Sequence, residues 1–300
     1  DVVSVIESVL DDPRPVINAQ VHKAKGEAVA AMKAEGLDYD QRMAELETIT
    51  HPRPLADLLE PMFEVYRQSH PWVADHPLRP KAVVREMWER AMDFTDYVRY
   101  HQLARSEGTV LRYLTDAYRT LVKTVPEDIK SDDLIDLTEW LGEMVRQVDS
   151  SLLDEWEALR DPDAARPLTT PVEEAPPPVT ANRRAFTILV RNALFQRVEL
   201  AARREWGALG DLDGDDGWTT ERWFEALTPY FEQYGSIEIG GEARNPGLVV
   251  IAEQADRWDV RQVILDPDDD RSWSIRAEVD LTASDAEGEA VVHVRDVAPT

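Results

Sequence analysis

Basic side chains recur at a helical spacing in one stretch of this acidic chain. Arg105, Arg112 and Arg119 are seven residues apart, and Lys123 follows four residues later. Seven residues are about two turns of an α-helix, so these cations would form one stripe along its axis, a suitable arrangement for binding phosphates. The pattern predicts contacts with the backbone of a nucleic acid. Asp116, four residues after Arg112, keeps a second interpretation open, in which the stripe is an ordinary solvated face of mixed charge.

Imidazole and carboxylate groups gather in a second place, around two prolines. His70, Asp75 and His76 lie within seven residues, with Trp72 between them. These groups are zinc ligands, but a lasting site needs three or four of them to converge. Three of the six histidines directly precede proline, which is typical of turns. We therefore expect turns here and no metal site.

A third stretch begins like a calcium-binding loop. Asp211, Asp213 and Asp215 occupy the first, third and fifth positions of such a loop. Asp216 then stands where the loop needs glycine, and Arg222 stands where a bidentate glutamate should complete the coordination. The sequence therefore favours an acidic surface turn without calcium.

The composition excludes several classes of function. The 300 residues include 33 basic and 59 acidic side chains, and the resulting net charge of −26 disfavours non-specific coating of nucleic acid or anionic lipid. The absence of cysteine excludes disulfides, thiolate metal sites and cysteine nucleophiles. The sequence also lacks a P-loop, a Gly-x-Gly-x-x-Gly turn, His-Glu-x-x-His and Gly-x-Ser-x-Gly. We expect no catalytic residue, cofactor or metal in this chain.

Neither a membrane span nor an export signal is predicted. No stretch approaches the roughly 18 apolar residues that a spanning helix needs, and no basic segment opens the chain. We therefore expect no membrane partner and a cytoplasmic location. A helical pattern is already under way at Asp1, so we also expect the sequence to be a fragment of a longer protein.

The first 160 residues are predicted to form an all-helical bundle. Apolar residues recur every three or four positions, and prolines, glycines or capping residues separate the segments. In the helix that carries the basic stripe, Val110, Leu114 and Leu121 mark the opposite, buried side. Besides the pattern at the start, the expected helices cover residues 15–35, 39–47, 55–66, 81–103, 107–124 and 131–156.

A proline-rich linker is predicted between two halves of the chain. Residues 161–180 contain six of the 19 prolines and almost nothing large to bury, so an extended, semi-rigid segment is expected. Residues 1–160 have 19 basic and 31 acidic side chains, and residues 181–300 have 13 and 24. Both halves are therefore acidic.

The second half, residues 181–300, is predicted to be an α+β roll. Helices are expected over residues 183–206 and 219–234, and strands over 248–251, 260–265, 273–281 and 290–297. Strict alternation in the third strand indicates an antiparallel sheet with one buried face. Two short segments, at 266–270 and 284–288, are expected to be hairpin turns. Helices packed on a curved meander would resemble the cystatin-like or nuclear-transport-factor-like roll, which makes the whole chain α+β.

Such a roll often encloses a pocket between its helices and its sheet. Tyr230, Trp258, Arg276 and Asp280 are the residues that could line it. No acid–base pair is fixed by their spacing, so the alternative is that they are ordinary core edges and surface. His293 stands alone on a predicted strand, and no role is assigned to it.

The sequence resembles a helicase family in several segments. Residues 94–119 contain Glu107-Gly108-Thr-Val-Leu-Arg112, which resembles the Glu-Gly-x-hydrophobic-hydrophobic-Arg ratchet helix of Ski-type superfamily 2 RNA helicases. A closer resemblance, to the uncharacterised C-terminal region of actinobacterial DEAD/DEAH-box helicases, covers residues 1–13, 69–78, 137–156, 258–267 and 273–281.

The resemblance implies an accessory C-terminal module of an ATP-dependent helicase. Two RecA-like motor domains and a winged helix would precede it, and ATP and Mg²⁺ would bind to that absent motor. Glu107, Gly108 and Arg112 would belong to a helix that lines the channel for a single strand, RNA rather than DNA, with Arg105, Arg119 and Lys123 beside them. The alternative is a protein-interaction or dimerisation module that makes no nucleic-acid contact. Exposed aromatic rings at Trp258 and Trp273 would favour that alternative.

Overall fold

The chain is an α+β protein, as the sequence predicts. A computed structural model describes residues 1–73, 75–149 and 178–300. The chain divides into two compact units, residues 1–168 and 169–300, which are treated separately below. Of the predicted linker at 161–180, only the last three residues lie within the described part. No described helix has both the length and the apolar character needed to cross a membrane.

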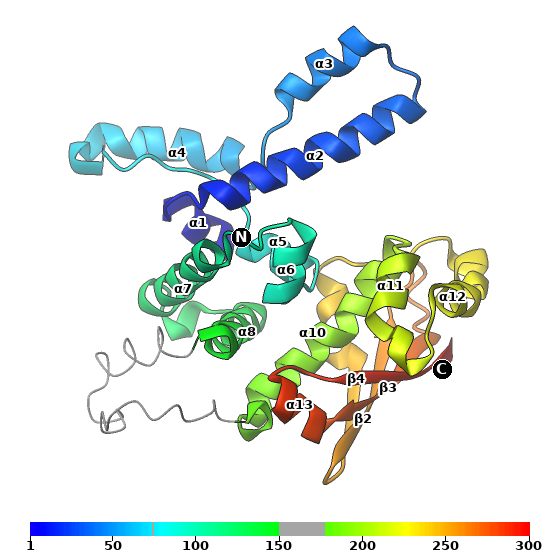
Figure 1. Ribbon diagram of the computed structural model, residues 1–300. Coiled ribbons are helices and arrows are strands. Elements are labelled where there is room, and N and C mark those ends of the chain that lie inside the picture. The colour runs from blue at the N-terminus through cyan, green and yellow to red at the C-terminus, as the bar shows by residue number, and fades with distance from the viewer. Residues whose placement is uncertain (74, 150–177) are drawn as a thin grey trace, which may run out of the picture. The chain divides into compact units, whose positions relative to one another are not determined.

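The described residues of the first unit form helices and no strand, in agreement with the sequence (Figure 1). Asp38 begins the third helix with a capping box, in which its side chain accepts a hydrogen bond from the Gln41 amide. Gly36, with a φ of +79°, follows the second helix. The helices are α1 (Val2–Val9), α2 (Arg14–Ala34), α3 (Tyr39–Thr48), α4 (Ala56–Ser69), α5 (Val84–Glu89), α6 (Phe94–Tyr100), α7 (Glu107–Thr124) and α8 (Asp132–Asp149).

The prediction of a single helix over residues 81–103 is wrong, because the helix is interrupted between α5 and α6. Ala91 has a φ of +52°, a left-handed conformation that ends a right-handed helix. Asp93 then starts α6 by accepting a hydrogen bond from the Asp96 amide at 2.7 Å. The apolar spacing continues across the break, so periodicity alone did not reveal it.

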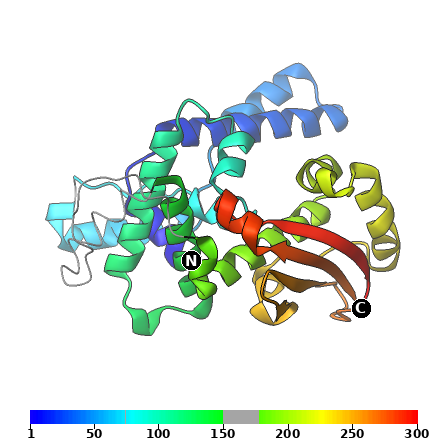
Figure 2. The ribbon, with the colours of Figure 1, turned by 60° about the horizontal axis from the view of Figure 1, so that its bottom comes forward.

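Helices α7 and α8 pack side by side through a glycine (Figures 1 and 2). A Cβ atom on Gly142 of α8 would lie 2.5 Å from Cε2 of Tyr118 on α7. Only glycine therefore lets the tyrosine ring lie against the α8 backbone. The predicted Ser131 cap of α8 is confirmed by a 3.3 Å hydrogen bond from the Leu134 amide to the Ser131 hydroxyl.

The second unit combines helices with one antiparallel sheet. Its strands lie in the order β1-β2-β3-β4, so each pairs with its neighbour in sequence. The elements are α10 (Arg183–Ala202), α11 (Trp206–Asp213), α12 (Thr220–Tyr234), β1 (Val249–Glu253), β2 (Arg257–Ile264), β3 (Trp273–Asp280), α13 (Leu281–Glu287) and β4 (Val292–Pro299). A bulge between Arg276 and Ala277 shifts the register of β3 against β4.

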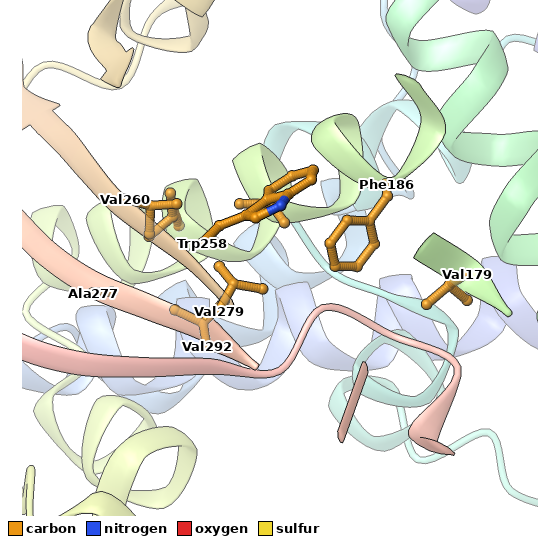
Figure 3. Packing of buried hydrophobic residues seen from close by; sticks show 9 residues of the cluster. Val179, Phe186, Trp258, Val260, Ala277, Val279 and Val292 are labelled. Carbon is orange, nitrogen blue, oxygen red and sulfur yellow. The ribbon is translucent and has the colours of Figure 1, made fainter. Parts of the chain in front are cut away.

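The core of this unit lies between α10 and one face of the sheet (Figures 2 and 3). The ring of Phe186 on α10 meets the ring of Trp258 on β2 edge to face, with centroids 4.9 Å apart. Alternate residues of β2 and β3 face α10 from the sheet, as the alternating pattern predicts, and further α10 residues complete the core. The buried members of the cluster are Val179, Phe186, Val190, Leu194, Trp258, Val260, Ala277, Val279 and Val292.

Two segments predicted as turns contain helix. The hairpin turn predicted at 284–288 is wrong, and the acidic surface turn predicted at 211–217 is confirmed only for its exposed second half, since its first residues end a helix. Residues 206–213 form α11, whose last residue, Asp213, is buried instead of lying in a surface turn. Residues 281–287 form α13 between β3 and β4, where Asp280 accepts the capping hydrogen bond from the Ala283 amide at 2.9 Å. In α11 a buried side chain, and in α13 a capping hydrogen bond, outweigh the turn-forming composition.

Candidate nucleic-acid interface

Helix α7 has a buried side and an exposed side, as its sequence predicts. Val110, Leu114 and Leu121 are completely buried. Arg112, Asp116 and Lys123 are exposed on the other side. The segregation of apolar from charged residues at a period of about 3.6 explains both why this segment is helical and how it is oriented.

A buried polar contact anchors the inner side of α7 to the start of the chain. The hydroxyl of Tyr113 donates a 2.9 Å hydrogen bond to Oε1 of Glu7 on α1. The same carboxylate accepts hydrogen bonds from the amides of Val83, Val84 and Arg85, at 2.7, 2.9 and 3.2 Å. Burial raises the pKa of Glu7, and these hydrogen bonds oppose that rise. Glu7 thereby joins α1, α5 and α7 at one point.

Lys81 reinforces this junction from inside. Its buried ammonium group donates hydrogen bonds to the carbonyl oxygens of Glu7 and Leu10, at 2.9 and 2.8 Å, and lies 3.2 Å from a carboxylate oxygen of Asp12. Burial lowers the pKa of Lys81, while Asp12 opposes the change. Nothing in the local sequence distinguishes this lysine from a surface lysine, so sequence analysis missed it.

Three of the predicted cations are available to bind a phosphate. Arg105, Arg112 and Lys123 are exposed, and within the described part of the chain none of them forms an ion pair within 4.0 Å. In particular, the expected neutralisation of Arg112 by Asp116 is not observed. Arg119 is half-buried. Arg105 precedes the helix, so the predicted stripe begins in the segment leading into α7.

Glu107 lies apart from the basic stripe. It is the first residue of α7, and five positions separate it from Arg112, which places the two about 140° apart around the helix axis. Gly108 has no atom within 4 Å of the position that a Cβ would take, so no close contact requires glycine there. The structure thus places Arg112 and Lys123 on the exposed side of α7, with Glu107 on a different side of the helix.

The exposed side of α7 offers charge without aromatic stacking. From Arg112 to Lys123 the helix rises about 16 Å, so the cations would contact separate phosphates. Tyr113 and Tyr118 are both buried and present no ring for a base to stack on. Such a face can hold a strand through its backbone, which carries no base identity.

A buried polar cluster that the sequence did not reveal lies where α2, α5 and α6 meet. Nε2 of His101 is 3.1 Å from Oε2 of Glu86, and the same oxygen accepts hydrogen bonds from Gln20 and Tyr97, at 2.7 and 3.2 Å. Burial raises the pKa of Glu86. The hydrogen bond and charge of His101, together with the hydrogen bond from Gln20, lower it by more, so the pKa of Glu86 lies below its ordinary value. The cluster joins α2 to α5 and to the end of α6.

The four pocket candidates of the second unit have separate structural roles. Tyr230 is buried, donates a 3.1 Å hydrogen bond to the Ser236 carbonyl, and has a pKa raised by that burial. Trp258 belongs to the core, Arg276 is exposed beside Asp296, and Asp280 caps α13. These positions do not place convergent polar groups around one cavity.

The aromatic rings that would favour docking through the sheet are buried. Trp258 and Trp273 expose only 5% and 6% of their surfaces. In the β2–β3 register, Trp258 faces Val279 and Trp273 faces Ile264, so the two rings lie at opposite ends of the paired strands. The sheet therefore presents no aromatic patch at these positions.

His70 and His293 both contact neighbouring side chains. In the described parts of the chain, no three histidine or carboxylate side chains are grouped to hold a metal ion. His70 stacks on Tyr66, with ring centroids 3.8 Å apart. The expectation that His293 stands alone is wrong, because its Nδ1 lies 2.8 Å from the carboxylate of Asp216.

Comparison with known families covers both units. A family model described as a domain of unknown function, DUF3516, matches residues 1–297. The chain belongs to the DUF3516 family. The match extends over α7 and over the sheet, so both units are parts of the DUF3516 region. No curated protein and no solved structure matches the chain.

Proposed function

We propose that this DUF3516 chain is an accessory module of an ATP-dependent helicase, in which the outer side of α7 holds a single strand. The observation that carries the proposal is a set of three exposed cations that form no ion pair with any described residue, Arg105, Arg112 and Lys123. The resemblance of Glu107, Gly108 and Arg112 to the ratchet helix supports it. RNA is the expected strand, and DNA is the alternative.

Local charge favours the strand at this face despite the acidic chain. The stripe contains Arg105, Arg112, Asp116, Arg119 and Lys123, four cations against one anion. A polyanion would be repelled by most of the protein, so attraction at one stripe would fix where the strand lies. The ratchet would then allow the strand to slide past, because phosphate contacts are the same at each nucleotide.

Within this proposal, the second unit is a roll of the cystatin-like or nuclear-transport-factor-like kind, and the module works in the cytoplasm beside the motor and winged-helix domains of a longer chain. The packing of α10 along one face of a four-stranded meander supports the roll. The module itself has no catalytic task in this scheme, since ATP hydrolysis belongs to the motor.

Fluorescence anisotropy with labelled single-stranded RNA across a salt series tests the proposal. Three phosphate contacts predict a slope of log affinity against log salt of about −2. The Arg105→Ala/Arg112→Ala/Lys123→Ala variant should remove that slope. A variant with the same loss of charge elsewhere, Arg14→Ala/Lys33→Ala/Arg99→Ala, should retain it. Equal binding by the two variants, or no binding by the wild type at low salt, would contradict the proposal.

A further inference from the structure

The face of the sheet that points away from α10 carries several arginines. Alternate residues of a strand point to opposite faces, and the face against α10 takes Trp258 and Val260 of β2 and Ala277 and Val279 of β3. The residues between these four therefore lie on the other face, which we call the outer face. The arginines of this face on β2 and β3 are Arg257, Arg261 and Arg276, of which the first and the last are exposed.

Arg261 of β2 lies directly opposite Arg276 of β3. The Leu281 amide donates a 3.4 Å hydrogen bond to the Asp256 carbonyl, five positions along the two strands from this pair. Hydrogen-bonded and non-hydrogen-bonded pairs alternate in an antiparallel ladder, so Arg261 and Arg276 form a non-hydrogen-bonded pair. In such a pair the Cα atoms are about 4.5 Å apart and the side chains are closest. Two like charges placed in this way destabilise a sheet unless an anion compensates them.

Arg261 has no counterion in the described part of the chain. No carboxylate of a described residue lies within 4.0 Å of its guanidinium group, although Asp259 precedes it by two residues on the same face. Asp259 lies 3.8 Å from Arg257 instead. Arg276 is only partly compensated, because Asp296 is 3.6 Å away and the two side chains are 46% and 50% exposed. The arginine pair therefore keeps positive charge that the described residues do not neutralise.

The charges on the outer face favour a single dianion as the ligand. A phosphate monoester carries a charge of about −1.5 to −2 at neutral pH, and its oxygens accept paired hydrogen bonds from guanidinium groups. A carboxylate carries less charge. A nucleic-acid strand would bring further phosphates against Asp259, Glu278 and Asp296, which surround the arginine pair in the register of the sheet. One isolated phosphate group therefore suits this face better than a polyanion.

We propose that Arg261 and Arg276 bind the phosphate monoester group of a small molecule. The phosphate oxygens would accept hydrogen bonds from both guanidinium groups, so the ligand would bridge β2 and β3. Val250 of β1 faces Arg261 and exposes 47% of its surface, and it would lie beneath an apolar part of the same molecule. This site belongs to the second unit and does not rest on the proposed strand contact of α7.

NMR spectra of the whole chain that record the arginine Nε–H groups test the proposal. Inorganic phosphate is the probe, and chloride at the same ionic strength is its reference. Phosphate should shift the signals of Arg261 and Arg276 until they saturate, and chloride should leave them in place. Shifts that never saturate, or that chloride reproduces, would overturn the proposal.

Two arginine variants separate this site from general attraction to the outer face. Arg261→Gln and Arg295→Gln each remove one exposed or half-buried positive charge, but Arg295 is already paired with Glu278 at 3.1 Å. Arg261→Gln should weaken phosphate binding, followed at Arg276, by about tenfold or more, because hydrogen bonds to a charged group are lost. Arg295→Gln should leave the affinity unchanged. Equal weakening by the two substitutions would contradict a site at the pair.

A gain of affinity gives an independent check. Asp296→Asn removes the carboxylate that competes for Arg276, so phosphate should bind more tightly. Asp211→Asn removes the same charge from an exposed position of α11 and should have no effect. If both variants change the affinity equally, net charge alone governs binding and the proposal fails.

Other ligands and the strand-binding proposal are distinguished in the same spectra. Glucose 6-phosphate should shift Arg261 at least as effectively as inorganic phosphate. Tighter binding at Arg261 by single-stranded RNA or by a phosphoserine peptide would replace the small molecule with that ligand. The Arg105→Ala/Arg112→Ala/Lys123→Ala variant should keep the Arg261 response in full. Because that variant removes only the α7 cations, failure of either proposal leaves a different result.

Discussion

The guanidinium group of Arg197 holds the carboxylate of Asp213 inside the second unit. Nε of Arg197 lies 3.1 Å from each carboxylate oxygen, and both side chains are buried. The same guanidinium group donates hydrogen bonds to the carbonyl oxygens of Ala193 and Val292, at 2.8 and 3.1 Å. Burial raises the pKa of Asp213, while the charge of Arg197 opposes that rise. One ion pair therefore joins α10, α11 and β4.

Removing one partner of this ion pair should be costly. Asp213→Ala leaves the buried guanidinium without its counterion, and we expect a loss of about 3–5 kcal/mol in the free energy of unfolding. Urea denaturation of the variant measures the loss. Asp211→Ala, an exposed position in the same helix, should change stability by less than about 0.5 kcal/mol. Equal stabilities of the two variants would show that the pair contributes nothing.

The contact between Gly142 and Tyr118 predicts that replacing two glycines of the first unit by alanine will have different effects on stability. Gly142→Ala would push a methyl group into the tyrosine ring and should destabilise the chain by about 1–3 kcal/mol. Gly108→Ala has open space and a better helix former, so it should be neutral or stabilising by up to about 1 kcal/mol. Thermal unfolding followed by circular dichroism compares the two, and a neutral Gly142→Ala would refute the close packing.

The lowered pKa of Glu86 predicts that its contribution to stability is lost on acidification. Its pKa in the folded chain lies below the ordinary value of 4.5, so its ionised form stabilises the fold at neutral pH. That contribution is present above about pH 4.5 and is lost as the pH falls through the lower, folded-state pKa. Glu86→Gln should therefore be less stable than wild type at pH 7, and the difference should shrink as the solution is acidified.

Urea denaturation at a series of pH values measures this difference. Glu89→Gln serves as its control, because Glu89 is exposed on the same helix and, among the described residues, pairs only with Arg85, four residues before it. A difference between wild type and Glu86→Gln that grows on acidification would contradict the prediction.

The burial of Trp258 predicts that its replacement by alanine will destabilise the chain far more than the same change at Trp72. Trp258→Ala removes a ring from the core beside Phe186, and we expect a loss of about 3–5 kcal/mol in unfolding free energy. Trp72→Ala removes a ring that is mostly exposed and should cost less than about 0.5 kcal/mol. Denaturant titrations followed by circular dichroism compare them, and similar losses would place Trp258 outside the core.

Sequence analysis predicted an element correctly where two different signals indicate the same boundaries or the same buried face. Helix α7 begins and ends where expected, at Glu107 and Thr124, because apolar periodicity and the following Pro126 coincide. The alternation in β3 likewise predicted its buried face. Prediction failed where apolar spacing continued through a break, as at Ala91, whose left-handed conformation depends on its buried surroundings.

The candidate site was predicted less completely than the fold. Spacing located Arg112 and Lys123 on the exposed side of α7 but did not show that Arg112 forms no pair with Asp116, since that depends on side-chain conformation. Lys81 and Glu86 were missed for a different reason. Their partners are 74 and 15 residues away, so no local pattern reveals these contacts.

The last strand has a consequence for the order of folding. β4 is the last strand of the sheet and pairs with β3. Two hydrogen bonds from residues far away in the sequence also hold it. Arg197 donates to the Val292 carbonyl, 95 residues on, and the Trp218 indole donates to the Val294 carbonyl, 76 residues on. During synthesis on the ribosome, α10 and β1–β3 would emerge before their partner strand exists. The second unit must then wait until Pro299 has left the exit tunnel, with the free edge of β3 exposed to other nascent chains in the meantime.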